Sequence, residues 1–103
     1  MKVSRKDRSA LDSGLLAGLR NIGKAALADF DALGIETVAE LATQDADALY
    51  VRLCEITRQR HDPCVHDVFA AAIHQAKTGE PVNWWTYSPA RKERQKLGTF
   101  PTL

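Results

Sequence analysis

The sequence predicts an all-α fold of about five short helices, followed by an irregular C-terminal segment that carries both tryptophans. Three observations support this prediction. Apolar residues recur at helical spacing in successive segments, residues typical of helix starts and stops separate those segments, and no stretch alternates apolar and polar residues as a strand does. The 103 residues suffice for one domain with one modest core.

The basic residues gather at the two ends of the chain. Residues 1–10 and 88–103 each carry a net charge of +3, whereas the stretch between them carries −5. We therefore predict a disordered basic arm over 1–9, a folded domain over 10–88 and a flexible basic tail over 89–103. Any polyanion that binds this protein must accommodate the acidic body.

The first two predicted helices flank a break at residues 20–23. On each side of the break four apolar residues share one helical face: Leu11, Leu15, Leu16 and Leu19, then Ala26, Leu27, Phe30 and Leu33. Gly34 comes directly after the second set and can take the left-handed conformation that ends a helix. Ile35 then folds back as the hydrophobic contact of that cap.

The next two helices each begin at a capping residue. Thr37 and Glu40 form a capping-box pattern, which starts a short helix through Leu41. Asp45 or Thr43 caps a longer helix that ends near residue 58. The apolar residues of the longer helix predict a buried stripe with two flanking positions: Leu49, Leu53 and Ile56, flanked by Ala48 and Val51.

Asp62 and Pro63 mark the start of the fifth helix, because Asp is favoured at the N-cap and Pro at the first helical position. This helix runs to about Thr78, and five of its residues face inward: Val65, Phe69, Ala72, Ile73 and Ala76. Gly79 and Pro81 end it. The chain that follows has no clear period, and we expect Trp84 and Trp85 to fold back onto the core.

The break at 20–23 is the first candidate site. Asn21 tolerates positive φ better than most residues, and Gly23 has no side chain to clash. Ile22 between them is expected to point inward and fix the turn to the core. The amides of Ile22, Gly23 and Lys24 then lie at a helix N-terminus, where backbone N–H groups and the helix dipole favour a phosphate. Arg20 and Lys24 add positive charge.

The stretch from Leu19 to Ile35 resembles the helix-hairpin-helix motif. That motif reads Leu-Pro-Gly-Ile-Gly, then a helix, then Leu-Gly-Ile; here the matching residues are 19–23 and 33–35 at the same spacing. Arg20 replaces the usual Pro and Asn21 the first Gly, as in the C-terminal domain of TfoX-like competence regulators. The resemblance implies sequence-nonspecific binding of DNA phosphates, in some members with a monovalent cation held by hairpin carbonyls.

A longer stretch, "LYVRLCEITRQRHDPCVHDVFAAAIHQA" followed by Trp84-Trp85, resembles the small bacterial "pathogenicity locus" family. The resemblance covers roughly residues 10–87 and identifies a family without a settled biochemical role. The alternative for the turn is therefore a purely structural corner between helices, because a fold alone does not fix a function.

Catalytic and metal-binding patterns are weak. Two cysteines and three histidines lie close together in sequence, but without zinc-ligand spacings: Cys54, His61, Cys64, His66 and His74. Structural thiols are the favoured interpretation; a Cys54–Cys64 disulfide, a redox pair, or a lowered pKa of an exposed Cys64 stay open. No nucleophile elbow or Gly-rich phosphate loop is present, so we expect neither an enzyme nor a cofactor.

No apolar run is long enough for a membrane helix, and the charged N-terminus is unlike a signal peptide. We therefore expect a cytoplasmic protein. Two functions remain. In the first, the turn binds DNA weakly and nonspecifically, and Trp84, Trp85, Arg91 and Lys92 contact bases. In the second, the turn is structural and the tryptophan segment or the acidic face binds a protein partner; the tryptophans themselves fit a core role as well.

Overall fold

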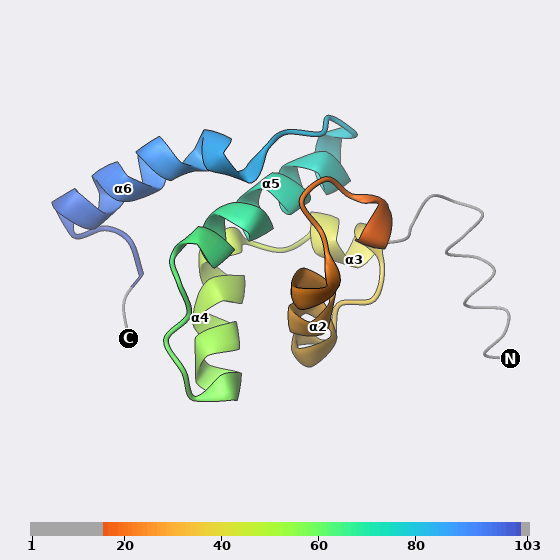
Figure 1. Cartoon of the computed structure of the whole chain (residues 1–103), viewed down its shortest axis with the longest axis horizontal. Helices are drawn as coiled ribbons and strands as arrows, with labels where there is room; N and C mark the ends of the chain where they lie inside the picture. The colour runs from red at the N-terminus through yellow and green to blue at the C-terminus, as the bar shows by residue number, and fades with distance from the viewer. Residues whose placement is uncertain (1–15, 102–103) are drawn as a thin grey trace, which may run out of the picture.

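The computed structural model describes residues 16–101, and over this range the chain is helical without a strand (Figure 1). The all-α prediction is confirmed. The predicted arm over 1–9 lies outside the described residues, as do Leu11 and Leu15 of the first predicted helix. Two 3-10 helices and five α-helices follow one another: η1 (Leu16–Gly18), α2 (Lys24–Leu33), α3 (Val38–Ala42), α4 (Ala46–Thr57), α5 (Cys64–Thr78), η2 (Trp84–Tyr87) and α6 (Ser88–Leu97).

Helix α5 is the centre of the fold. It contacts α3, α4, η2 and α6, while α2 packs against α4. In Figure 1 α5 lies above α2 and α4. Helix α6 runs along the upper left of the view, on the side of the molecule that holds the C-terminus. The core lies beneath α5, where the rings of Phe30 and Phe69 are 5.5 Å apart and both side chains are fully buried. Burial of each such ring stabilises the fold by about 1.5–3 kcal/mol.

The predicted ends of α2, α3 and α4 are confirmed by their hydrogen bonds, whereas the N-cap of α5 is Pro63 and not the predicted Asp62. Gly34 has φ 77°, and the N–H of Ile35 donates to the carbonyl of Phe30 at 2.9 Å, which closes α2 as predicted. Thr37 and Glu40 form both bonds of the capping box. Asp45 is the residue that caps α4, because its side chain accepts from the N–H of Ala48.

The predicted stripe of α4 is wrong at its last position. Ile56 is 46% exposed, whereas Tyr50, absent from the prediction, is buried. Figure 1 shows the C-terminal end of α4 extending away from α5, so α5 does not cover the last turn of α4. Tyr50 is buried because Phe100, far along the chain, packs beside it.

The prediction of irregular chain beyond Pro89 is wrong over Ser88–Leu97, which form α6. This helix has no apolar stripe, and Arg91 is its one buried residue. It is held to the body by ion pairs instead, which helical periodicity does not reveal. Gly98, with φ 77°, ends it and turns the chain so that Phe100 becomes buried.

The two tryptophans differ in burial. Trp84 is partly buried, but Trp85 is 56% exposed. Their rings meet edge to face, with centroids 5.7 Å apart. The prediction that both fold back onto the core is therefore wrong for Trp85, whose ring remains available to another molecule.

Candidate functional site

The turn at residues 20–23 has the positive φ predicted at Asn21, whereas Gly23 has a negative φ that does not require glycine. Asn21 has φ 74°, and Ile22 is buried between the helices. Gly23 is the N-cap of α2, with φ −108° and ψ −163°, and no side chain caps the helix. The first amides of α2 therefore have no side-chain acceptor among the described residues.

The turn is tied to the loop that follows α5. The side-chain amide of Asn21 donates to the carbonyl of Val82 at 2.9 Å, and the guanidinium of Arg20 donates to Asn83 at 3.2 Å. The backbone N–H of Arg20 donates to Gln75 at 2.8 Å. These bonds explain why Asn rather than Gly stands at position 21: it accepts the positive φ and also supplies a donor.

Gly23 and Lys24 are exposed at the surface of the turn. A Cβ added to Gly23 would meet no atom of residues 16–101 within 4 Å beyond its chain neighbours, so the described structure leaves space at the N-cap of α2. A hollow of about 210 Å³ adjoins the turn, and Asp29 is its acidic residue. Burial raises the pKa of Asp29, and the charge of His61 partly offsets this. An anion bound at the turn is therefore disfavoured on the Asp29 side whenever that carboxyl is ionised.

The predicted contact residues of the C-terminal segment differ in exposure. Trp85 and Lys92 are exposed, and the loop that precedes the tryptophans is bonded to the turn through Asn83. Arg91 is turned away and buried, at 7% exposure. The structure therefore brings the tryptophan segment next to the turn and removes Arg91 from the surface.

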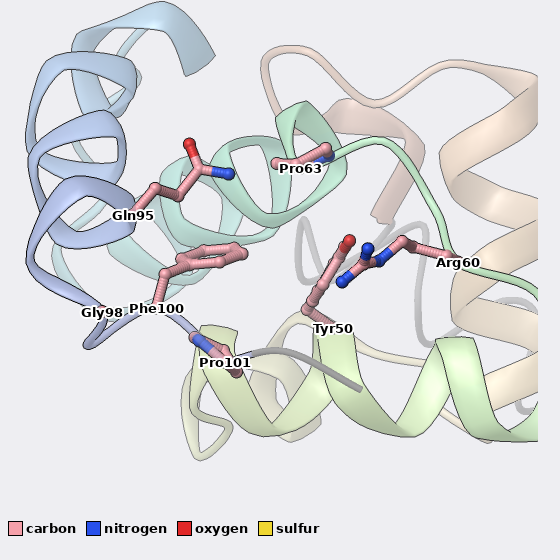
Figure 2. A pocket seen from close by; sticks show the side chains of 7 residues that line it. All are labelled: Tyr50, Arg60, Pro63, Gln95, Gly98, Phe100 and Pro101. Atoms are coloured by element: carbon pink, nitrogen blue, oxygen red, sulfur yellow. The ribbon is translucent and has the colours of Figure 1, made fainter.

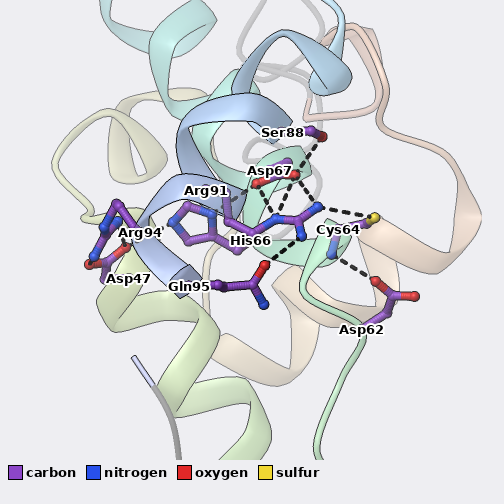
Figure 3. Close-up of polar contacts among 9 residues, drawn as sticks. All are labelled: Asp47, Asp62, Cys64, His66, Asp67, Ser88, Arg91, Arg94 and Gln95. Atoms are coloured by element: carbon purple, nitrogen blue, oxygen red, sulfur yellow. Dashed lines mark hydrogen bonds and ion pairs between the residues drawn. The ribbon is translucent and has the colours of Figure 1, made fainter. Parts of the chain in front are cut away.

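A buried polar network holds Arg91 (Figure 3). The partner of Arg91 is the carboxylate of Asp67, which is fully buried and accepts from the Nε and Nη2 atoms of Arg91 at 3.1 and 2.9 Å. Ser88 donates to the same carboxylate at 2.7 Å. No buried side-chain N or O atom of the described residues lacks a partner. The network therefore satisfies the condition under which buried charges are tolerated.

The network continues through His66, whose two ring nitrogens lie 2.8 Å from Asp47 and 3.1 Å from Asp67. Both contacts are donor bonds only when both nitrogens carry hydrogen. Asp47 also binds Arg94 of α6 through two bonds, at 2.6 and 3.1 Å. Two carboxylates of the body thus hold two arginines of α6.

The Asp47–Arg94 pair predicts acid sensitivity. The hydrogen bond from Arg94, followed by that from His66, lowers the pKa of Asp47 from its ordinary value of 3.8, against an opposing effect of burial. Its contribution to stability is therefore complete above pH 3.8 and is lost as the pH falls through the lowered pKa. We expect the urea midpoint of Asp47→Asn to change less between pH 7 and pH 3 than that of the wild type. An equal change in both proteins would contradict this role; Asp31→Asn, on the exposed side of α2, is the control.

The cysteines are free thiols. Cys54 is buried and accepts a hydrogen bond from the N–H of His61 at 3.5 Å, so the interpretation as a structural thiol fits it. Burial, followed by the neighbouring carboxylate of Asp62, raises the pKa of the Cys64 thiol. The option of a lowered pKa at Cys64 is therefore wrong, because burial and then the Asp62 carboxylate both raise it. Among residues 16–101 no three potential ligands group to hold a metal ion.

We expect Cys64 to react slowly with iodoacetamide near neutral pH, because its raised pKa leaves little thiolate. Asp62→Asn removes the second cause of the shift and should speed alkylation several-fold. Mass spectrometry of timed samples measures the rate at Cys64, with buried Cys54 as the internal reference. Unchanged rates in Asp62→Asn would contradict the carboxylate's effect.

A second hollow, of about 370 Å³, lies at the C-terminal end of α6 (Figure 2). We call it the C-terminal pocket and define it by its lining residues: Tyr50, Arg60, Pro63, Gln95, Gly98, Phe100 and Pro101. Behind it the ring of Phe100 contacts His66 edge to face at 5.0 Å, and Arg94 lies 5.7 Å from the centroid of the Phe100 ring. The pocket therefore adjoins the buried network.

Sequence reasoning missed the network and the C-terminal pocket, because their residues come from distant parts of the chain. Helical periodicity gave no signal for Asp67, which lies opposite the predicted inward face of α5. That side of α5 is buried only because η2 and α6 pack against it. Arg91, the partner of Asp67, lies 24 residues away.

The family model "Cdd1: Pathogenicity locus" matches residues 11–93 of this chain. A curated relative, "Mitomycin resistance protein McrB" of Streptomyces lavendulae, is 36% identical over 81 residues, which cover 79% of this chain and 77% of the relative. No solved structure matches the chain. Within the described residues, no helix has both the length and the apolar character required to cross a membrane.

Proposed function

This chain belongs to the Cdd1, or pathogenicity locus, family, and we propose that it is a small, non-enzymatic, cytoplasmic module that binds the DNA backbone without reading sequence. The observation that carries the proposal is the open N-terminus of α2. Among the described residues its amides have no side-chain acceptor, and a Cβ built at Gly23 would meet no atom within 4 Å beyond its chain neighbours. Backbone amides and the helix dipole together favour a phosphate there.

The charges around the turn set the expected strength. Lys24 is exposed beside the amides, and the guanidinium of Arg20 keeps donors beyond its bond to Asn83. The acidic body and Asp29 oppose the binding of an anion. One turn contacts few phosphates, so we propose weak and salt-sensitive binding.

Fluorescence anisotropy with labelled duplex at several salt concentrations tests the proposal. Binding through the turn should follow a log–log salt slope of roughly −2 to −3, the value for two or three phosphates. A variant with Lys2, Arg5, Lys6 and Arg8 changed to Gln should retain most of that slope. Binding that disappears with these residues would assign it to the basic arm, and no binding at low salt would refute the proposal. Lys92→Gln and Lys96→Gln test α6 in the same way.

The acidic neighbour of the turn offers a test in the opposite direction. We expect Asp29→Asn to tighten DNA binding about two- to fivefold, since one carboxylate near the phosphate is removed. Asp31→Asn removes the same charge from an exposed position of α2 and should change affinity less. Equal effects of the two substitutions would show that only net charge matters, not the turn.

A second candidate function is a protein-interaction module, and the exposure of Trp85 favours it. Exposed tryptophans are typical anchors of protein interfaces. In this case Trp85→Ala would abolish capture of a protein partner, whereas changes at Gly23 would leave that capture unchanged. The name of the relative suggests a cellular test: the mitomycin resistance of cells that carry the Gly23 or Trp85 variants can be compared with that of cells carrying the wild type.

A further inference from the structure

The C-terminal pocket has the construction of a small-molecule site. Three separate segments form it: α4 with Tyr50, the loop before α5 with Arg60 and Pro63, and the end of α6 with residues 95–101. Its volume of about 370 Å³ suits a ligand of one or two rings. Nothing in the proposed DNA contact uses it.

The walls of the C-terminal pocket favour a flat, apolar ligand body. The rings of Tyr50 and Phe100 lie 5.6 Å apart at 51° and are held from behind by the core. Pro63 and Pro101 supply two further rigid apolar surfaces. The hydroxyl proton of Tyr50 is already donated to the carbonyl of His61, so Tyr50 presents its ring edge without a free donor.

Two hydrogen-bond donors face the same space from opposite sides (Figure 2). The guanidinium of Arg60 has no hydrogen-bond or ion-pair partner among the described residues. Gln95 accepts from Nη1 of Arg91 at 3.0 Å, which fixes its oxygen toward that donor and leaves its NH₂ group toward the pocket. Among the described residues that line the pocket, Arg60 is the charged one and neither Asp nor Glu is present, which favours an anion.

We propose that the C-terminal pocket binds a small aromatic carboxylate. The ring lies against Phe100 and Tyr50, the carboxylate pairs with Arg60, and a carboxylate oxygen or a ring substituent accepts from Gln95. Charge-assisted hydrogen bonds from a guanidinium to a carboxylate are the strong contacts of this arrangement. This proposal does not depend on DNA binding, and the outcome of the DNA-binding experiments does not affect it.

The test uses the full chain and 2-naphthoate as the probe, with 2-naphthamide as its neutral analogue. Titration followed by ¹H–¹⁵N NMR should shift the side-chain amide of Gln95 and the backbone amide of Gly98, with a Kd of about 1 mM or tighter for a ligand of about a dozen heavy atoms. The neutral amide should bind at least about tenfold more weakly, because it loses the charged contact with Arg60.

Two variants locate the binding. Arg60→Ala should weaken 2-naphthoate at least about tenfold, whereas Arg52→Ala, which removes an exposed arginine of α4, should not. Gln95→Glu keeps the acceptor for Arg91, so the fold is retained, but its negative charge should repel the probe. Circular dichroism melts confirm that each variant is folded. Equal binding of the neutral amide, an unchanged Arg60→Ala, or shifts confined to another surface would overturn the proposal.

Discussion

Asp67→Asn is expected to lower the free energy of unfolding by about 3–5 kcal/mol. The substitution keeps the shape of the side chain and removes its charge, which leaves the guanidinium of Arg91 buried without a counterion. Breaking one partner of a buried pair carries this large cost because the remaining charge stays desolvated. The loss approaches the whole stability of a marginal domain, about 5–15 kcal/mol. Urea unfolding at pH 7, followed by circular dichroism, measures it.

The double variant Asp67→Leu/Arg91→Leu separates the ion pair from the shape of the site. Replacing both charged groups with apolar ones removes the uncompensated charge, so the double variant should be markedly more stable than Asp67→Asn. Hydrogen exchange should show in Asp67→Asn that α6 opens before α4 and α5, because Arg91 is its one buried residue. A single variant as stable as the wild type would show that the network contributes little.

Gly23→Asp should weaken DNA binding at least tenfold while the protein stays folded or becomes slightly more stable. Gly23 has extended φ and ψ values, and an added side chain meets open space, so aspartate fits. As an N-cap it accepts from the α2 amides and stabilises the helix by a few tenths of a kcal/mol relative to glycine. The same carboxylate occupies and repels the phosphate position, and a tenfold loss corresponds to about 1.4 kcal/mol.

The opposite signs of the two effects make this variant informative, because a merely unfolded protein cannot produce them. Ala39→Asp places the same charge in the first turn of α3 on an exposed position and should reduce affinity far less. Anisotropy in low salt measures affinity, and a thermal melt measures stability. Wild-type affinity in Gly23→Asp would rule out the turn as the DNA contact, whatever the two basic ends do.

The sequence predicted the helix boundaries well because each is fixed by neighbours within a few residues. Gly34 with Ile35, Thr37 with Glu40, and Asp45 with Ala48 are pairs whose hydrogen bonds form within one turn. The conformation of the turn at Asn21 followed from the same local chemistry. Its role in binding phosphate stays a prediction.

Contacts between distant residues account for what the sequence did not predict. Helix α6 has no apolar stripe, and it lies on the body because Arg91 and Arg94 reach Asp67 and Asp47, which are 24 and 47 residues away. The loss of Arg91 from the predicted surface follows from the same ion pair. Ile56 is exposed because it lies on the part of α4 that extends away from α5.

The sequence by itself therefore determined the all-α class, the positions of α2 to α5, most of their caps and most of the core, since backbone hydrogen bonding and helical periodicity act over short distances. Only the tertiary structure decided which charges pair, which tryptophan is exposed and that a pocket forms between Tyr50, Arg60 and Phe100. Electrostatic pairing and burial depend on distances in space between segments far apart in the chain, and no local pattern encodes those distances.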